Sequence, residues 1–265
     1  MKEYISLARV RGIHNLKEIY YDNVLGPVWN DCFDKGEYIY LANEIRQNPP
    51  QNLDRLEKTL NKLSKYAIYE AIRNGLIKSN QYLDGPNTNV CVLPTDLIGP
   101  SSPAVTIGSG KIIILYNEYL FKSDEQLSST VAHEYHHSAW TSMYFKPNKV
   151  NTLLDRAIFE GKAMYFQRML YPEMDNLPLY SNSAENIREI FLTNLGSTNP
   201  TIQDQVMFGY GDIPYLFGYS EGYKMISSYL KMNPNQSIKA WTSLTPDEIY
   251  TSLKNRFITI TRARH

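Results

Sequence analysis

The run His133-Glu-Tyr-His-His137 carries the residue types of a catalytic metal site. On a helix, His133 and His137 are one turn apart and project from the same face, so both imidazoles can bind one ion. Zinc accepts histidine nitrogen, and its catalytic sites use three protein ligands and a water molecule. Glu134 follows the first histidine and can act as the general base that takes a proton from this water. The spacing therefore predicts a zinc centre of the hydrolytic type.

The clustering of histidine favours a metal site over a helix that holds these residues by chance. The chain has five histidines, and three of them lie within five consecutive residues. His136 lies beside the second ligand, and we expect it to point away from the ligand face. A metzincin would have a further histidine six residues after His137, but that position is Met143, and Trp140 stands where this class requires glycine. The metzincin class is therefore excluded.

Glu160 is the predicted third ligand. It lies 23 residues after His137, and a carboxylate from a second helix completes the His₂Glu ligand set of the gluzincins. Its neighbours are largely apolar, where an unpaired carboxylate would be costly. Asp155 and Glu173 are the competing carboxylates, and Asp155 is also a candidate acceptor for the outer nitrogen of a ligand histidine. We therefore expect Zn²⁺ to be held by the two histidines and Glu160.

These motifs resemble those of a bacterial family of predicted zinc-dependent proteases. The resemblance spans residues 89–253 and is carried by HEYHHSAW, LLDRAIFEGKAMYF, FGYSEGYKMISSYL and SLTPDEIYTSL. The family pattern is HEYHH, then EG-x-A, then GY-x-x-GY, and the chain follows it in that order. Lys162 stands where the family commonly has leucine. The resemblance implies a gluzincin-like fold and metallopeptidase activity.

A hydrogen-bond donor for the oxyanion is the remaining part of such a site. Zincin peptidases commonly use a tyrosine or a histidine from a later helix, and apart from the C-terminal residue no histidine follows His137. Tyr219 and Tyr223 match the GY-x-x-GY element of the family. We favour Tyr219 over Tyr223, with Tyr210 as a third candidate. Packing of these tyrosines in a core explains them equally well.

A small sheet and several helices must position these residues. Apolar residues spaced by three and four predict a helix over residues 53–77 that ends near Gly75. Short β-branched runs predict strands over residues 89–93, 104–107 and 111–115. A capping-box pattern from Ser123 to Gln126 begins a helix that carries HEYHH to about residue 142. Further helices are expected after it, one over residues 151–170 and one beginning with the capping box of Thr245.

The predicted fold class is α+β and zincin-like, with a small, mostly antiparallel sheet, the metal helix and a helical C-terminal half. We expect residues 1–85 to form a mainly helical N-terminal region and residues 86–265 the catalytic region, within one continuous structural unit. A strand beside the metal can pair with an extended peptide or protein substrate through main-chain hydrogen bonds. Residues 104–108 are the candidate strand.

Composition excludes several other classes of function. Lys+Arg and Asp+Glu both total 27, so the formal net charge is zero and no basic surface for nucleic acid is expected. No stretch has the roughly 20 apolar residues of a membrane span, and the N-terminus lacks the apolar core of a secretion signal. We therefore expect a cytoplasmic protein, in which Cys32 and Cys91 are reduced thiols.

Two other interpretations stay open. The first is a protein that keeps the zinc or a peptide groove but acts by binding, as a sensor, chaperone or regulator. Glu134 argues against it, because binding needs no general base. The second is a closed structural zinc site, with His136 or Cys91 as the fourth ligand.

Overall fold

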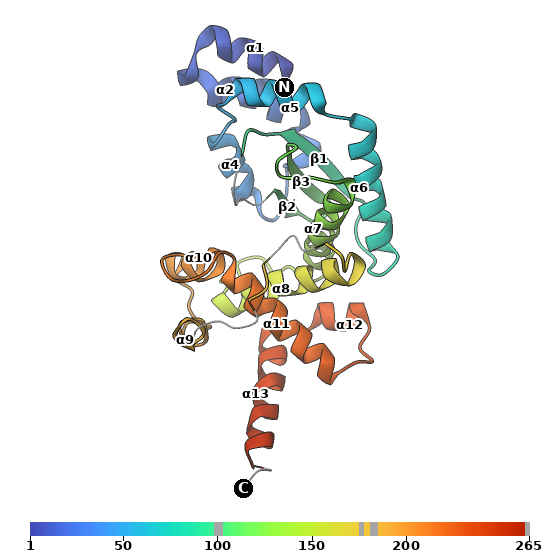
Figure 1. Cartoon of the computed structure of the whole chain (residues 1–265), viewed down its shortest axis with the longest axis vertical. Coiled ribbons are helices and arrows are strands. Elements are labelled where there is room, and N and C mark those ends of the chain that lie inside the picture. The colour runs from blue at the N-terminus through green and yellow to red at the C-terminus, as the bar shows by residue number, and fades with distance from the viewer. Residues whose placement is uncertain (98–102, 175–177, 181–184, 263–265) are drawn as a thin grey trace. The chain divides into compact units, whose positions relative to one another are not determined.

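The computed structural model describes residues 1–97, 103–174, 178–180 and 185–262 (Figure 1). The chain divides into two compact units, Met1–Met143 and Tyr144–His265, each with hydrophobic core clusters of its own. The boundary expected after residue 85 lies inside the first unit. The division into a helical region and a catalytic region stays a prediction.

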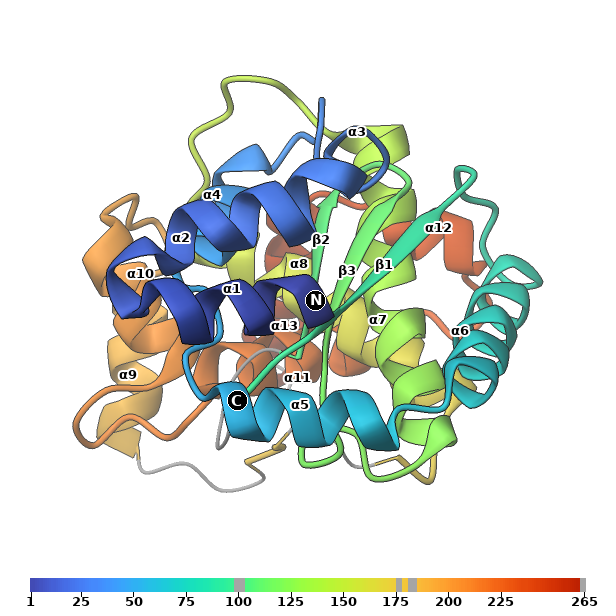
Figure 2. The same cartoon turned by 90° about the horizontal axis from the view of Figure 1, so that it is seen from above.

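The first unit combines N-terminal helices, a three-stranded sheet and the helix of the HEYHH run. Its elements are α1 Lys2–Arg11, η1 Ile13–Asn15, α2 Leu16–Tyr20, η2 Tyr21–Leu25, η3 Gly26–Val28, α3 Trp29–Cys32, α4 Ile39–Gln47, α5 Leu53–Lys62, α6 Lys65–Asn80, β1 Asn89–Pro94, β2 Ala104–Gly108, β3 Lys111–Tyr116 and α7 Asp124–Tyr144. Figure 2 shows α1, α2 and α4 on one side of the sheet and α6 and α7 on the other. The three predicted strands are confirmed.

The helix predicted over residues 53–77 is two helices, α5 and α6. Ser64 separates them, because its side chain accepts a backbone hydrogen bond as the N-cap of α6. Gly75, which was expected to end the helix, lies inside α6. A Cβ atom at Gly75 would lie 2.7 Å from Ser128 O and 2.9 Å from the Val131 side chain. Glycine is therefore required for the close approach of α6 to α7, and the expected helix end was wrong.

The sheet has the strand order β1-β3-β2 and is mixed. β2 and β3 are antiparallel, as the turn at Gly110 requires, whereas β1 pairs with β3 in parallel. Alternate residues face opposite cores. Ile107 and Ile113 pack with the N-terminal helices, and Ile112 and Ile114 pack with α6 and α7. The sheet is therefore covered by helices on both faces.

The α7 helix begins at the predicted cap. Ser123 Oγ accepts a hydrogen bond from Gln126 N at 3.1 Å, and the Gln126 side chain accepts one from the backbone before the cap. Residues 127–139 are all buried, so their polar groups need partners. Ser128 Oγ donates to Ala71 O at 2.8 Å, and Tyr135 OH donates to Leu83 O at 2.9 Å. These bonds fix α7 in place within the first unit.

The second unit is helical in the part that the structure describes. Its elements are α8 Leu153–Leu170, α9 Glu185–Thr193, α10 Pro200–Phe208, α11 Phe217–Met232, α12 Ile238–Ser243 and α13 Pro246–Arg262. Thr152 and Asp155 form a capping box at the start of α8, and Thr245 and Glu248 form the predicted one at the start of α13. Both helix starts therefore follow from local sequence.

The α8 and α11 helices approach each other backbone to backbone. A Cβ atom at Gly161 of α8 would lie 2.7 Å from Tyr223 N and closer still to the carbonyl of Gly222. A Cβ atom at Gly222 would overlap Ala157 O. Two glycines in contact thus set the spacing of the central helix pair of this unit.

Cys32 and Cys91 form a disulfide, so the expectation of two reduced thiols was wrong. The bridge joins α3 to β1, whose Cα atoms at these positions are 6.1 Å apart, within the usual range. The α3 helix packs against β1 and β3, which the sequence spacing of 59 residues did not indicate. Disulfides persist in oxidising compartments, so the bridge does not support the cytoplasmic expectation.

The α+β class is confirmed, and the mixed sheet with its helices is consistent with a zincin-like fold. No helix in the described ranges is both long and apolar enough to cross a membrane.

Candidate metal centre

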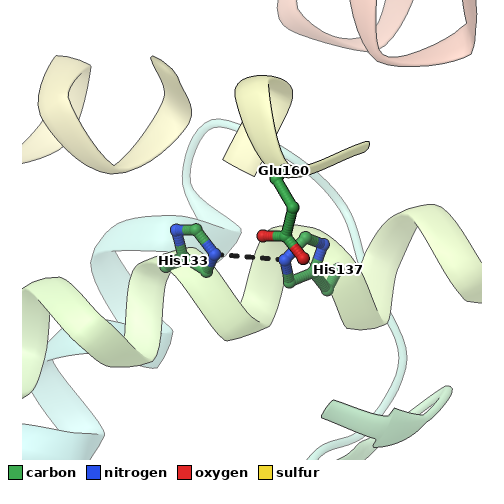
Figure 3. A group of neighbouring side chains, drawn as sticks. All are labelled: His133, His137 and Glu160. Atoms are coloured by element: carbon green, nitrogen blue, oxygen red, sulfur yellow. Dashed lines mark hydrogen bonds between the residues drawn. The ribbon is translucent and has the colours of Figure 1, made fainter. Parts of the chain in front are cut away.

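His133 and His137 lie one turn apart on α7, and the Nε2 atoms of their rings point toward each other. Their Nε2 atoms are 3.1 Å apart, and the ring planes are inclined at 81° (Figure 3). Both residues are buried, with 7% and 4% of their surfaces exposed. The i, i+4 spacing thus produces the juxtaposition that the sequence predicted.

Glu160 joins these histidines in a group of three potential metal ligands. One ligand atom from each of His133, His137 and Glu160 lies within 4.8 Å of the others (Figure 3). Within the described residues, this is the one group of three or more His, Cys, Asp or Glu side chains that could hold a metal ion. The structure therefore brings together the three predicted ligands.

The group fits a zinc ion in its chemistry, and the two histidines also fit it in spacing. Two nitrogens and one carboxylate are the donor set of a catalytic zinc site. Two nitrogens about 2.0 to 2.1 Å from a tetrahedral ion lie about 3.3 Å apart, close to the 3.1 Å between the histidine Nε2 atoms. Little movement of the rings is needed to accept the ion.

Glu134 is held by a residue that the sequence did not identify. Its side chain is buried, with 6% exposed, and its Oε2 accepts a hydrogen bond from Thr106 Oγ1 at 2.8 Å. The same hydroxyl lies 2.9 Å from the backbone oxygen of Glu134. The available signal was strand alternation, which places Thr106, a polar residue, on the buried side of β2 that faces α7.

The two candidates for a fourth zinc ligand are not placed to serve. Cys91 is bonded to Cys32 and has no thiolate to offer. His136 is fully buried, but its ring centroid is 6.4 Å from that of His137, and it does not belong to the ligand group. A closed structural zinc site of the kind considered above is therefore not supported.

The competing carboxylates are used elsewhere or exposed. Asp155 accepts hydrogen bonds from Thr152 and Lys149 at the start of α8, and Glu173 is exposed. Burial raises the pKa of Asp155, but the hydrogen bonds from Lys149 and Thr152 outweigh it and hold the pKa below its usual value. Asp155 thus caps its own helix.

The two candidate tyrosines occupy different surroundings on α11. The Tyr219 ring lies against Phe208, with centroids 6.0 Å apart. The Tyr223 ring lies 5.9 Å from that of Tyr165, and the Arg168 guanidinium lies 5.6 Å from its centroid. Tyr210 is 72% exposed. The assignment of an oxyanion donor to Tyr219 or Tyr223 stays a prediction.

The β2 strand lies at the edge of the sheet, as expected for a strand that pairs with substrate. Its outer edge is already partly used, because Tyr38 N donates to Ile107 O at 2.9 Å. Ala104, Thr106 and Ile107 are at most 5% exposed. Peptide pairing along the whole of residues 104–108 is therefore not supported.

Comparison with known proteins finds a matching family model and a curated relative. Residues 68–251 match the family model described as predicted Zn-dependent protease (DUF2268). The chain is 25% identical over 198 residues to the "Uncharacterized protein YjaZ" of Bacillus subtilis (strain 168). The aligned region covers 68% of this chain and 73% of that protein. No solved structure matches the chain significantly. Because the family model spans more than half of its length, the chain belongs to the family of predicted Zn-dependent proteases.

Proposed function

We propose that the chain is a zinc-dependent peptidase of the gluzincin type. The observation that carries the proposal is the group of His133, His137 and Glu160, with the carboxylate of Glu134 buried next to the first ligand. The two histidines and Glu160 would bind Zn²⁺. When bound, the ion would supply Lewis acidity, which polarises a peptide carbonyl and makes water easier to deprotonate.

The protein's own contribution would be proton transfer and stabilisation of charge. Glu134 would accept a proton from the attacking water and pass it to the amine nitrogen as the C–N bond breaks and the C–O bond forms. Its Oε2 is hydrogen-bonded to Thr106, so Oε1 would be the oxygen that takes the proton. Tyr219 or Tyr223 would donate a hydrogen bond to the developing oxyanion.

The proposed substrate is a peptide or protein. The test begins with chain stripped of metal by a chelator and then given one equivalent of zinc. We expect it to cleave members of a broad peptide library only after zinc is added, as read by mass spectrometry. Glu160→Gln keeps the size of the side chain but removes its charge, and we expect it to bind zinc more weakly.

Zinc-loaded protein that cleaves no member of the library would refute the peptidase proposal. The chain would then be better explained as a zinc-containing peptide-binding protein, and binding of the same library would be measured next.

A further inference from the structure

Thr106 is a polar side chain on an apolar face of the sheet. Strand alternation places it on the side of β2 that packs toward α6 and α7, with Ala104 on the same strand and Ile112 and Ile114 on β3. Thr106 is 5% exposed. A buried hydroxyl without a partner is costly, and valine has nearly the same shape, so packing alone does not explain threonine here.

Both polar contacts of the Thr106 hydroxyl go to Glu134. The Oγ1 atom lies 2.8 Å from the carboxylate Oε2 and 2.9 Å from the backbone oxygen. The hydroxyl has one hydrogen, and an ionised carboxylate is the stronger acceptor. In the part of the chain that the structure describes, Glu134 Oε1 makes no hydrogen bond to protein, so one carboxylate oxygen is held and the other is not.

We propose that Thr106 is a positioning residue that orients the carboxylate of Glu134 for proton transfer. A β-branched side chain has few χ1 rotamers, and β2 is paired with β3, so the hydroxyl is presented from a rigid support. Holding Oε2 fixes the rotation of the carboxylate and leaves Oε1 as the proton acceptor. The inference rests on the proposed peptidase function for its catalytic consequence, but the Thr106–Glu134 interaction can be measured without activity.

The alternative is a purely structural role for Thr106. Its hydroxyl also lies near the backbone oxygen of Glu134, and a hydrogen bond to that oxygen would attach α7 to the sheet without orienting the carboxylate. The chain offers a matched control for such an attachment. Gly110 N donates to Ser138 Oγ at 2.8 Å, a buried hydrogen bond between the β2–β3 turn and α7. Ser138→Ala removes a bond between the turn and the helix without touching the carboxylate of Glu134.

The first experiment measures catalysis in Thr106→Val, Thr106→Ser and Ser138→Ala, each loaded with zinc. We expect Thr106→Val to lower kcat by about 10- to 100-fold, the scale of a misplaced catalytic group, with KM and zinc affinity nearly unchanged. Thr106→Ser restores the hydroxyl and should recover most of kcat, while Ser138→Ala should lower stability but leave kcat near the wild-type value. Wild-type kcat in Thr106→Val, or equal losses in Thr106→Val and Ser138→Ala, would overturn the proposal.

The second experiment uses metal-free protein and needs no substrate. The urea midpoint is measured for wild type, Thr106→Val, Glu134→Ala and the double variant. We expect the fall in midpoint caused by Thr106→Val to shrink to about half or less when Glu134 is already alanine, because the two side chains interact. Additive falls would show that the hydroxyl serves the backbone only and would overturn the proposal. If the wild type proves inactive, the peptidase function fails, and this cycle still decides whether Thr106 holds the carboxylate.

Discussion

Gly161→Ala tests whether close packing of α8 and α11 supports the helix that carries Glu160. A Cβ atom at position 161 would lie 2.7 Å from Tyr223 N and closer to the Gly222 carbonyl, so it meets backbone atoms that cannot rotate away. Overpacking of this kind costs about 1–3 kcal/mol, and rigid backbone favours the upper end. Alanine regains about 1 kcal/mol of helix propensity over glycine. We therefore expect a net loss of about 2 kcal/mol in the free energy of unfolding.

The assay is urea unfolding followed by circular dichroism, with zinc affinity measured on the same variant. Gly196→Ala is the matched control, because a Cβ atom there meets nothing within 4 Å, and we expect it to be neutral or slightly stabilising. Gly161→Ala should also weaken zinc binding, since Glu160 is the adjacent residue. Equal stabilities of Gly161→Ala and Gly196→Ala would refute the packing argument.

Two further predictions concern the stability of each unit. Reducing the Cys32–Cys91 bridge, which spans 59 residues, should lower the free energy of unfolding by about 4 kcal/mol through the entropy of the unfolded chain. Urea unfolding with and without reductant measures this change. A variant with both cysteines replaced by serine should not respond to reductant. Asp155→Asn should cost about 1 kcal/mol near pH 7, the value of a helix cap. Because hydrogen bonds from Lys149 and Thr152 lower the pKa of Asp155 in the folded state, its contribution is complete above the unfolded pKa of about 3.9 and is lost as pH falls through the folded value. The difference between Asp155→Asn and wild type should therefore shrink below about pH 4, and a difference independent of pH would contradict the assignment.

Local patterns predicted the parts of the site that lie on one element. The i, i+4 spacing places His133 and His137 on one helix face, and the Ser123 and Thr245 caps mark helix starts, because each depends on residues close in sequence. Glu160 was predicted from its apolar surroundings and the ligand set that zinc requires. The predictions that concern one helix needed no knowledge of tertiary packing, whereas Glu160 lies on a second helix, α8.

Features that depend on contacts between distant elements were missed or misread. Gly75 has the residue type of a helix end, but its role is to admit α7, which only the packed structure shows. The Cys32–Cys91 bridge requires α3 to lie beside β1. Strand alternation places the polar Thr106 on a buried face, but its contact with Glu134 is visible only in the packed structure. In each case the decisive partner lies on a different element, so the periodicity of one element does not identify it. The partner is 28 residues away for Thr106 and 59 residues away for Cys32.

The proposed role of Glu134 is that of a general base beside a zinc ion bound by His133, His137 and Glu160. The decisive measurement is turnover of zinc-loaded wild type and Glu134→Gln on the same peptide, because glutamine keeps the shape and can still accept the hydrogen bond from Thr106. We expect one zinc per chain in both proteins and a kcat about 10²- to 10⁴-fold lower in the variant. Equal turnover of the two proteins at equal zinc content would contradict it.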